Sequence, residues 1–226
     1  MFEHGFTTTE RNLVQPIRSD LWEARVDSPF PGLTTHAYLW TGGPNGNVLF
    51  YGTQTSADFD ELERLGGVAH QYLSHRDEAG PMLAEVRRRF GARLHAPAVE
   101  LAEIGAHAHV DVPLGGRHVD ANGIEVIPTP GHTPGSTCYL VPGVNGQRYL
   151  FTGDTMYFGA EGDWVAGYLP PISEAAPLAD SLRLLGTLKP DLVISSAFTG
   201  DTAVHVPGSR WSECAAQASS RLAAVA

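Results

Sequence analysis

The segment Pro130-Gly131-His132-Thr133-Pro134-Gly135-Ser136 constrains the fold of this chain more than any other segment. Its prolines fix φ, and its glycines permit backbone conformations that other residues avoid, so the segment forms a tight and rigid loop. A histidine in such a loop is held in one direction, which suits a metal ligand or a general base. The fold must therefore bring this loop to a place where the His132 imidazole can act.

Short apolar runs broken by glycine and proline alternate with helical patterns on both sides of this loop. The predicted strands are residues 21–26, 33–40, 47–51, 68–73, 147–152 and 191–195, with further short strands between 110 and 139. The predicted helices are residues 56–62, 80–90, 97–104, 174–188 and 211–225. This order predicts an α/β (α+β) fold in which helices lie outside two mixed β-sheets.

The chain has the length of one globular domain. Its 226 residues can bury a single large core, and 42% hydrophobic with 18% charged residues is typical of a soluble fold. No run of about 18 apolar residues occurs, so a membrane-spanning helix is excluded. Residues 1–12 lack the apolar segment of a secretory signal, and we therefore expect a cytoplasmic protein.

The formal net charge of −10 limits the classes of partner. Such a chain repels phosphate backbones, which argues against nucleic acid as the default partner. The arginines at 87–89 and 93 fall in an amphipathic helical pattern, so we expect them to form a solvated face. Cys138 and Cys214 follow no metal-binding spacing, and we expect two buried thiols.

Three polar side chains lie where metal ligands are commonly gathered. His75 follows the predicted strand 68–73, Asp154 follows the strand 147–152, and His132 lies in the rigid loop. Loops at strand ends converge without disturbing the core. These groups therefore form a candidate site for a divalent metal.

The chain resembles the metallo-β-lactamase-fold hydrolases over roughly residues 12–192. In this family a strand leads into H-x-H-x-D-H, followed by G-H-T-P-G-S, then T-G-D, then a late strand that ends in P-G-H. The chain contains the second motif in full at residues 131–136, and Thr152-Gly153-Asp154 matches the third. The resemblance implies one such domain over residues 1–226, an αββα sandwich with the site between the sheet edges, and a possible homodimer.

The first motif departs from the family pattern. Aligned with His75 as its first histidine, it reads His75-Arg76-Asp77-Glu78-Ala79-Gly80. Asp77 then stands for the second histidine, and Ala79 and Gly80 replace the Asp-His pair. We expect Glu78, one residue beyond Asp77, to point away from the site.

The late strand has Ala197 or Phe198 where the family has its final histidine. The resemblance implies that the replaced residues hold a second metal, so we expect at most one metal. The expected metal ligands are His75, Asp77, His132 and Asp154. Two imidazoles and two carboxylates suit Zn first, with Fe or Mn as alternatives.

A second segment, His107-Ala108-His109-Val110-Asp111, spells H-x-H-x-D more literally. It leads to a Pro-Gly turn, whereas a predicted helix follows His75 as it does in the family. We therefore expect exposed side chains at His107, His109, His118 and His4. We expect hydrogen-bonded and partly buried side chains at His36, His70 and His95.

The first functional hypothesis is a hydrolase acting on a small-molecule substrate. One bound metal would lower the pKa of a water to about 7, and the metal-bound hydroxide would attack an ester, thioester or lactone carbonyl. The expected catalytic residues are Asp154, which would orient the water or accept its proton, and Asp77, which would help to fix the ion. The negative charge disfavours phosphodiesters and therefore a nuclease.

The second hypothesis is a non-catalytic descendant that binds a small molecule or a protein, with no metal. In that case His75 would pair with Asp77 or Asp154, because carboxylates left together repel one another unless a cation or a protonated histidine compensates. The aromatic residues after Asp154 are pocket wall or ordinary packing on either hypothesis: Tyr157, Phe158, Trp164 and Tyr168.

Overall fold

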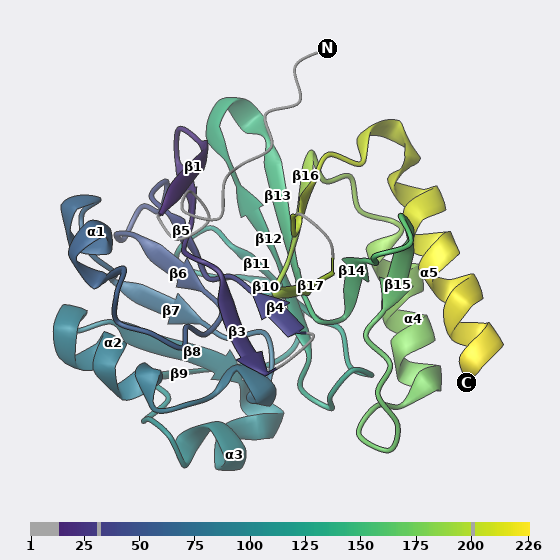
Figure 1. Cartoon of the computed structure of the whole chain (residues 1–226), viewed down its shortest axis with the longest axis horizontal. Helices are drawn as coiled ribbons and strands as arrows, with labels where there is room; N and C mark the ends of the chain where they lie inside the picture. The colour runs from purple at the N-terminus through teal and green to yellow at the C-terminus, as the bar shows by residue number, and fades with distance from the viewer. Residues whose placement is uncertain (1–13, 31–32, 200–201) are drawn as a thin grey trace.

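The computed structural model describes residues 14–30, 33–199 and 202–226. Two β-sheets pack face to face, and helices cover the outer face of each sheet (Figure 1). This αββα arrangement confirms the fold class expected from the sequence. Because His4 precedes residue 14, the expectation for its side chain lies outside the described residues.

The first sheet has the strand order β1-β2-β5-β6-β7-β8-β9. Its strands are β1 Gln15–Arg18, β2 Leu21–Glu23, β5 Tyr38–Trp40, β6 Val48–Phe50, β7 His70–Tyr72, β8 Arg93–Pro97 and β9 Val112–Leu114. Pairing is antiparallel from β1 to β6 and parallel from β6 to β9. The sheet is therefore mixed, as the alternation of strands and helices predicts.

The second sheet has the strand order β10-β11-β12-β13-β16-β18. Its strands are β10 His118–Val119, β11 Glu125–Pro128, β12 Thr137–Pro142, β13 Arg148–Gly153, β16 Leu192–Ser195 and β18 Val204–His205. Only β13 and β16 pair in parallel. Two small sheets accompany it, one of β3 Asp27–Phe30, β4 Leu33–Thr35 and β17 Ala197–Phe198, the other of β14 Met156–Phe158 and β15 Trp164–Ala166.

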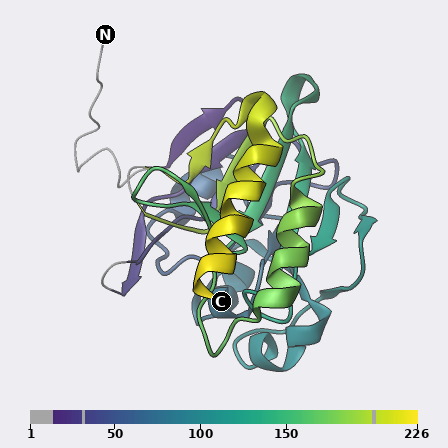
Figure 2. The ribbon, with the colours of Figure 1, turned by 90° about the vertical axis from the view of Figure 1, so that its right-hand side faces the viewer.

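Helices enclose the sandwich on both sides. They are α1 Phe59–Arg64, α2 Met82–Phe90, α3 Leu101–Gly105, α4 Ala175–Leu185 and α5 Trp211–Val225, with short 3₁₀ turns η2 Arg76–Glu78, η3 Ala98–Glu100, η4 Val144–Gly146 and η5 Gly208–Arg210. The first three helices lie over the first sheet, and α4 and α5 lie side by side over the second (Figure 2). No helix of the described residues has the length and apolar character needed to cross a membrane.

Aromatic side chains fill the space between the two sheets. Phe50 of β6 stacks on Phe151 of β13 with ring centroids 3.9 Å apart, and Tyr38 and Tyr139 meet these rings at tilted or edge-on angles. Such pairs add to the stabilisation that apolar burial already supplies. This core holds the two sheets, and hence their edges, in a fixed relation.

The prediction of one strand over residues 33–40 is wrong. The segment forms β4 and β5, which belong to different sheets. Between them His36 donates its backbone N–H to the Ser196 carbonyl oxygen, and its buried ring hydrogen-bonds with the Ala24 carbonyl at 2.8 Å. These contacts turn the chain from one sheet to the other, which residue alternation alone does not reveal.

The expectations for the arginines and the cysteines are confirmed in part. Arg87, Arg88 and Arg89 are exposed on α2 and pair with Asp111, Glu85 and the acids of α1. Arg93 is also exposed, but it begins β8 and does not belong to the helix. Both cysteines are free, and Cys138 is buried. Cys214 is only partly buried, because α5 lies at the surface of the sandwich.

Candidate metal centre

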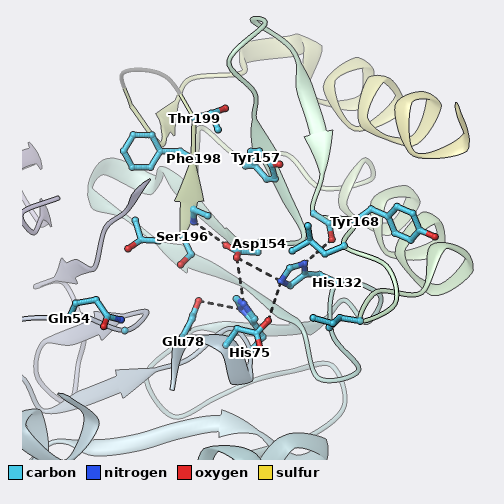
Figure 3. Close-up of a pocket in the computed structure, with 17 residues that line it drawn as sticks. Gln54, His75, Glu78, His132, Asp154, Tyr157, Tyr168, Ser196, Phe198 and Thr199 are labelled. Atoms are coloured by element: carbon cyan, nitrogen blue, oxygen red, sulfur yellow. Dashed lines mark hydrogen bonds and ion pairs between the residues drawn. The ribbon is translucent and has the colours of Figure 1, made fainter. Parts of the chain in front are cut away.

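The three sequence-predicted groups meet at one edge of the sandwich. His75 follows β7, His132 lies in the loop between β11 and β12, and Asp154 follows β13 (Figure 3). Tyr51, after β6, joins the two sheets directly behind them: its hydroxyl donates to the Ile194 carbonyl and accepts from the Gly153 N–H, each at 2.9 Å. The sheet-to-sheet hydrogen bonds thus set the position of the site.

The His132 imidazole is oriented by its own loop and by the loop opposite. Its Nδ1 lies 2.7 Å from the Gly167 carbonyl oxygen, to which it donates as Nδ1–H. This donation fixes the tautomer in which Nε2 carries a free lone pair. The Nε2 atom is buried and has no hydrogen-bond partner in the described structure. A ring held through Nδ1 with Nε2 directed into a cavity is the usual state of a metal-binding histidine.

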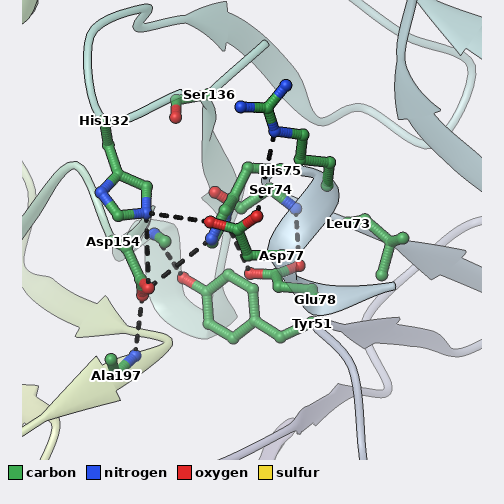
Figure 4. A network of polar contacts seen from close by, with 12 residues as sticks. Tyr51, Leu73, Ser74, His75, Asp77, Glu78, His132, Ser136, Asp154 and Ala197 are labelled. Carbon is green, nitrogen blue, oxygen red and sulfur yellow. Dashed lines mark hydrogen bonds and ion pairs between the residues drawn. The ribbon is translucent and has the colours of Figure 1, made fainter. Parts of the chain in front are cut away.

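His75 is buried, with a carboxylate beside each ring nitrogen. Its Nε2 lies 3.6 Å from Asp154 Oδ2 and its Nδ1 lies 3.5 Å from Glu78 Oε1, so neither nitrogen makes a hydrogen bond (Figure 4). Burial lowers the pKa of His75 below its usual value, although Asp154 acts in the opposite direction. A neutral His75 therefore offers one lone pair to the site.

Asp154 is held between the two imidazoles. Its Oδ1 accepts the Ala197 backbone N–H at 3.0 Å, which leaves Oδ2 at 3.6 Å from His75 Nε2 and 3.8 Å from His132 Nε2. Asp77 Oδ2 lies 3.9 Å from His132 Nε2, and the Asp77 side chain is 49% exposed. The geometry brings all four expected ligands together.

The expectation that Glu78 points away from the site is wrong. Its side chain is only 5% exposed, Oε2 accepts the Ser74 N–H at 2.8 Å, and Oε1 faces His75 without a hydrogen-bond partner. Burial, and then the charge of Asp154, raise the pKa of Glu78 well above its usual range. A third carboxyl group thus belongs to the site.

The position of Glu78 favours a different register for the first motif. Shifted by two residues, H-x-H-x-D-H places Leu73 at the first histidine, His75 at the second, Asp77 at the aspartate and Glu78 at the last histidine. Leu73 packs into an apolar cluster with Leu83 and other residues, as expected for a side chain that has left the site. Comparing both registers of the motif could have revealed Glu78 from the sequence.

Glu100 is a further residue that the sequence patterns did not single out. Its carboxylate is buried, with Oε1 accepting the Gly135 N–H at 2.9 Å and Oε2 accepting the Arg76 N–H at 2.7 Å. It therefore ties the loop of His132 to the turn that carries His75 and Asp77. A buried glutamate distant from both motifs gives no signal in a single sequence.

The donor set fits a divalent cation. Ligand atoms of His75, Asp77 and His132 all lie within 4.8 Å of one another, and Asp154 touches both imidazoles. Two buried ring nitrogens without a hydrogen-bond partner lie beside Asp154 Oδ2: Nε2 of His75 and Nε2 of His132. Buried polar atoms without partners are costly, and a bound cation would satisfy them.

These groups form the floor of a cavity of about 540 Å³. Tyr157 and Tyr168 line its walls, whereas Phe158 and Trp164 pack into the core beneath α4 and α5. Of the four aromatic residues after Asp154, two therefore form pocket wall and two serve in ordinary packing. A cavity of this volume accommodates a small organic molecule.

The remaining described histidines stand apart from this cavity. His107, His109 and His118 are exposed, as expected. His36 is buried and bonded to a carbonyl, and His70 Nδ1 lies 2.9 Å from His95 Nε2 in a buried pair. The literal H-x-H-x-D segment is thus a surface feature.

The fold and the donor set together define an αββα protein with a candidate divalent-metal centre at the sheet edge. The chain belongs to the metallo-beta-lactamase superfamily, whose family model matches residues 56–197. The metallo-beta-lactamase from Pontibacter korlensis shares the fold with a TM-score of 0.72 and 18% identity, over 93% of this chain and 98% of that chain. ETHE1 from Myxococcus xanthus gives a TM-score of 0.61 and 22% identity, over 82% and 80% of the two chains.

One curated protein is similar in sequence over a shorter region. The hydroxyacylglutathione hydrolase of Rhizobium meliloti (strain 1021) is 33% identical over 103 residues, which are 43% of this chain and 38% of that protein. The match thus spans well under half the length of that relative.

Proposed function

We propose that the protein is a hydrolase of carboxylic esters, thioesters or lactones that uses one divalent cation, bound by His75, Asp77, His132 and Asp154. The observation that carries the proposal is the convergence of buried, unpartnered imidazole nitrogens with carboxylates at the floor of a cavity. The curated relative, itself described as a hydrolase, supports the same reaction class. We expect zinc first, with iron or manganese as alternatives, since nitrogen and oxygen donors suit all three.

A divalent cation held by these residues would supply Lewis acidity, which activates water as a nucleophile near neutral pH. Asp154 is placed to orient the attacking water or to accept its proton, because Oδ2 faces the two imidazoles while Oδ1 is fixed by the Ala197 N–H. Burial raises the pKa of the nearby Tyr157 hydroxyl, which therefore stays protonated and can donate a hydrogen bond to the departing oxygen or sulfur.

The test is the metal content of protein purified without added metal, measured by elemental analysis. We expect about one metal per chain, lost in His132→Ala and retained in His107→Ala, whose exposed side chain belongs to the literal H-x-H-x-D segment. Asp154→Asn serves as a second variant, and circular dichroism checks that each variant folds. The metal-containing protein is then assayed on ester, thioester and lactone panels.

One observation favours the second hypothesis, a non-catalytic binding protein: Leu73 and Ala197 stand where the family has histidines. A protein that contains no metal, even after incubation with Zn, Mn or Fe, and that hydrolyses nothing in the panels would contradict the proposal. The cavity would then be assigned to a binding protein.

A further inference from the structure

The cavity above the candidate centre has two chemically different parts. Its floor carries the imidazoles and carboxylates, and its mouth carries large apolar and aromatic side chains (Figure 3). The apolar part is formed by Tyr168, Leu169 and Ile172 from the segment 167–174 and by Phe198 from β17.

Of the large apolar side chains that are exposed in the described part of the chain, Leu169 and Ile172 are the two that line the cavity. They are 57% and 49% exposed, and both line the cavity. Apolar surface left in water is unfavourable by about 25 cal/mol per Å², and a ligand that covers it recovers this free energy. Exposed apolar side chains gathered at a cavity mouth commonly mark a binding surface.

The segment that carries these two side chains is firmly anchored. The Leu169 N–H donates to Ser173 Oγ at 2.9 Å, and Ser173 Oγ in turn donates to the His132 carbonyl at 2.8 Å. The Ile172 N–H donates to the Leu169 carbonyl at 2.9 Å, and the Glu174 N–H donates to the Gly131 carbonyl at 2.8 Å. The apolar wall is therefore preorganised and fixed relative to His132, which reduces the ordering cost of binding.

Apart from the two histidines, the ionisable side chains near the floor of the cavity are carboxylic acids. Asp77, Glu78 and Asp154 are the acidic residues, and no lysine or arginine lines the cavity in the part of the chain that the structure describes. One divalent cation would offset two of these three carboxyl groups, so the loaded floor would carry no net positive charge. A carboxylate or phosphate elsewhere on a substrate would find no lysine or arginine of the described lining to pair with.

We infer that the substrate is an electrically neutral ester or lactone with an aliphatic chain, and that Leu169 and Ile172 bind this chain. The inference rests on the proposed hydrolase function and narrows its substrate class. In the reaction a water oxygen bonds to the carbonyl carbon, the carbon–oxygen bond to the alkoxy group breaks, and that oxygen takes a proton, giving a carboxylic acid and an alcohol. An acylglutathione, which carries carboxylates, is disfavoured by the same electrostatics.

Binding is tested without turnover by calorimetry with three probes of equal length: octanamide, its analogue with a terminal carboxylate, and its analogue with a terminal ammonium group. We expect octanamide to bind at least about tenfold more tightly than the carboxylate analogue. Leu169→Ser should weaken octanamide binding by about tenfold, the scale of apolar contacts in a pocket. Val119→Ser, an equivalent change at an exposed valine of β10 outside the cavity lining, should leave it unchanged. Equal affinities for octanamide and the carboxylate analogue, or tightest binding of the ammonium analogue, would overturn the inference.

Turnover gives an independent readout with p-nitrophenyl esters. We expect kcat/KM for the octanoate to exceed that for the acetate, and Leu169→Ser to reduce the octanoate value by about tenfold, a larger loss than for the acetate. Hydrolysis of both esters without chain-length preference would overturn the inference and leave the proposed hydrolase intact. Octanamide binding without hydrolysis of any ester would instead defeat the proposed function and keep the apolar binding site.

Discussion

At the scale of the residue, the site depends on which atoms are left without partners. His132 donates its Nδ1–H to the Gly167 carbonyl oxygen and leaves Nε2 without a hydrogen bond, whereas His75 has a carboxyl group beside each ring nitrogen. A Cβ on Gly167 would lie 1.9 Å from the Asp154 carbonyl oxygen and 3.0 Å from His132 Nδ1, so only glycine permits this close approach. The residues that orient ligands thus matter as much as the ligands.

Replacing Glu78 by Gln is expected to weaken metal binding by about 10–100-fold, the usual effect of removing a partner of a ligating histidine. The reason is that Glu78 Oε1 faces the buried His75 Nδ1, and a bound cation would favour the ionised carboxylate, which the amide of glutamine cannot form. Competition with a chelating dye measures the affinity. Glu85→Gln on the exposed face of α2 is the matched control. An unchanged affinity in Glu78→Gln would assign Glu78 to packing alone.

The buried His70–His95 pair predicts a pH-dependent stability. Burial, with the charges of His70 and Arg93, lowers the pKa of His95 from its ordinary value of 6.5 to about 3 in the folded chain. As the pH falls below 6.5, the unfolded chain therefore binds a proton at His95 that the folded chain does not bind. The contribution of neutral His95 to the free energy of unfolding is complete above pH 6.5 and is lost as the pH falls toward 3. The free energy of unfolding should fall by about 1.4 kcal/mol per pH unit below pH 6.

Urea denaturation between pH 7 and pH 5 measures this slope, and His95→Gln should flatten it. The exposed His118→Gln should retain the slope of the parent protein. Because the comparison uses slopes, a general loss of stability in the variant does not obscure the result. Equal slopes in the parent protein and His95→Gln would show that other groups account for the pH dependence.

At the scale of the element, the site is assembled by contacts between loops that belong to different sheets. The rigid loop after β11 meets the segment 167–174 through Gly131 and Ser173, and it meets η3 through Glu100. Each loop is short and hydrogen-bonded at both ends. These hydrogen bonds explain how the imidazole rings of the site keep a fixed orientation at the edge of the sandwich.

Glu100→Gln is expected to reduce stability by about 1.5–3 kcal/mol, the scale of hydrogen bonds to a charged group, because its amide cannot accept both backbone N–H groups equally well. The same variant should weaken metal binding, since Glu100 joins the turn of His75 to the loop of His132. Thermal unfolding and chelator competition provide the two measurements. Glu103→Gln, at a half-exposed position that pairs with Arg76, is the control. Retention of full stability in Glu100→Gln would contradict this assignment.

Sequence patterns predicted most elements well and failed where contacts distant in sequence decide the structure. The helix predicted over 174–188 forms as α4, and the strand predicted over 147–152 forms as β13, because periodicity is a local property. The division of 33–40 into two sheets depends on Ser196, far along the chain. Glu78 was missed because the motif was aligned in one register only. The literal match at 107–111 was correctly set aside, because a helix follows His75 whereas the strand β9 follows residue 111.

At the scale of the whole molecule, acidic side chains are balanced by arginines in some regions and not in others. On α2 the arginines pair with Glu85 of the same helix and with acids of neighbouring segments, so neither sign accumulates there. In the cavity three acidic side chains lie together with two imidazoles and no lysine or arginine in the described lining. Electrostatic repulsion within the folded molecule is therefore concentrated where a cation would bind.

Removal of the metal is accordingly expected to destabilise the entire fold, since both sheets contribute ligands. A cation present at one hundred times its dissociation constant stabilises the folded state by about 2.7 kcal/mol. For a chain of this size each kcal/mol shifts the melting temperature by about 2–4 °C, so dialysis against a chelator should lower it by about 5–11 °C. Added Zn or Mn should restore the original value, whereas Mg, which favours all-oxygen sites, should not.

In His132→Ala the chelator should have little effect, because the ligand set is already broken. A melting temperature that does not respond to chelation in the parent protein would mean that the carboxylates and imidazoles neutralise one another, as in a protein whose cavity binds its ligand without a metal.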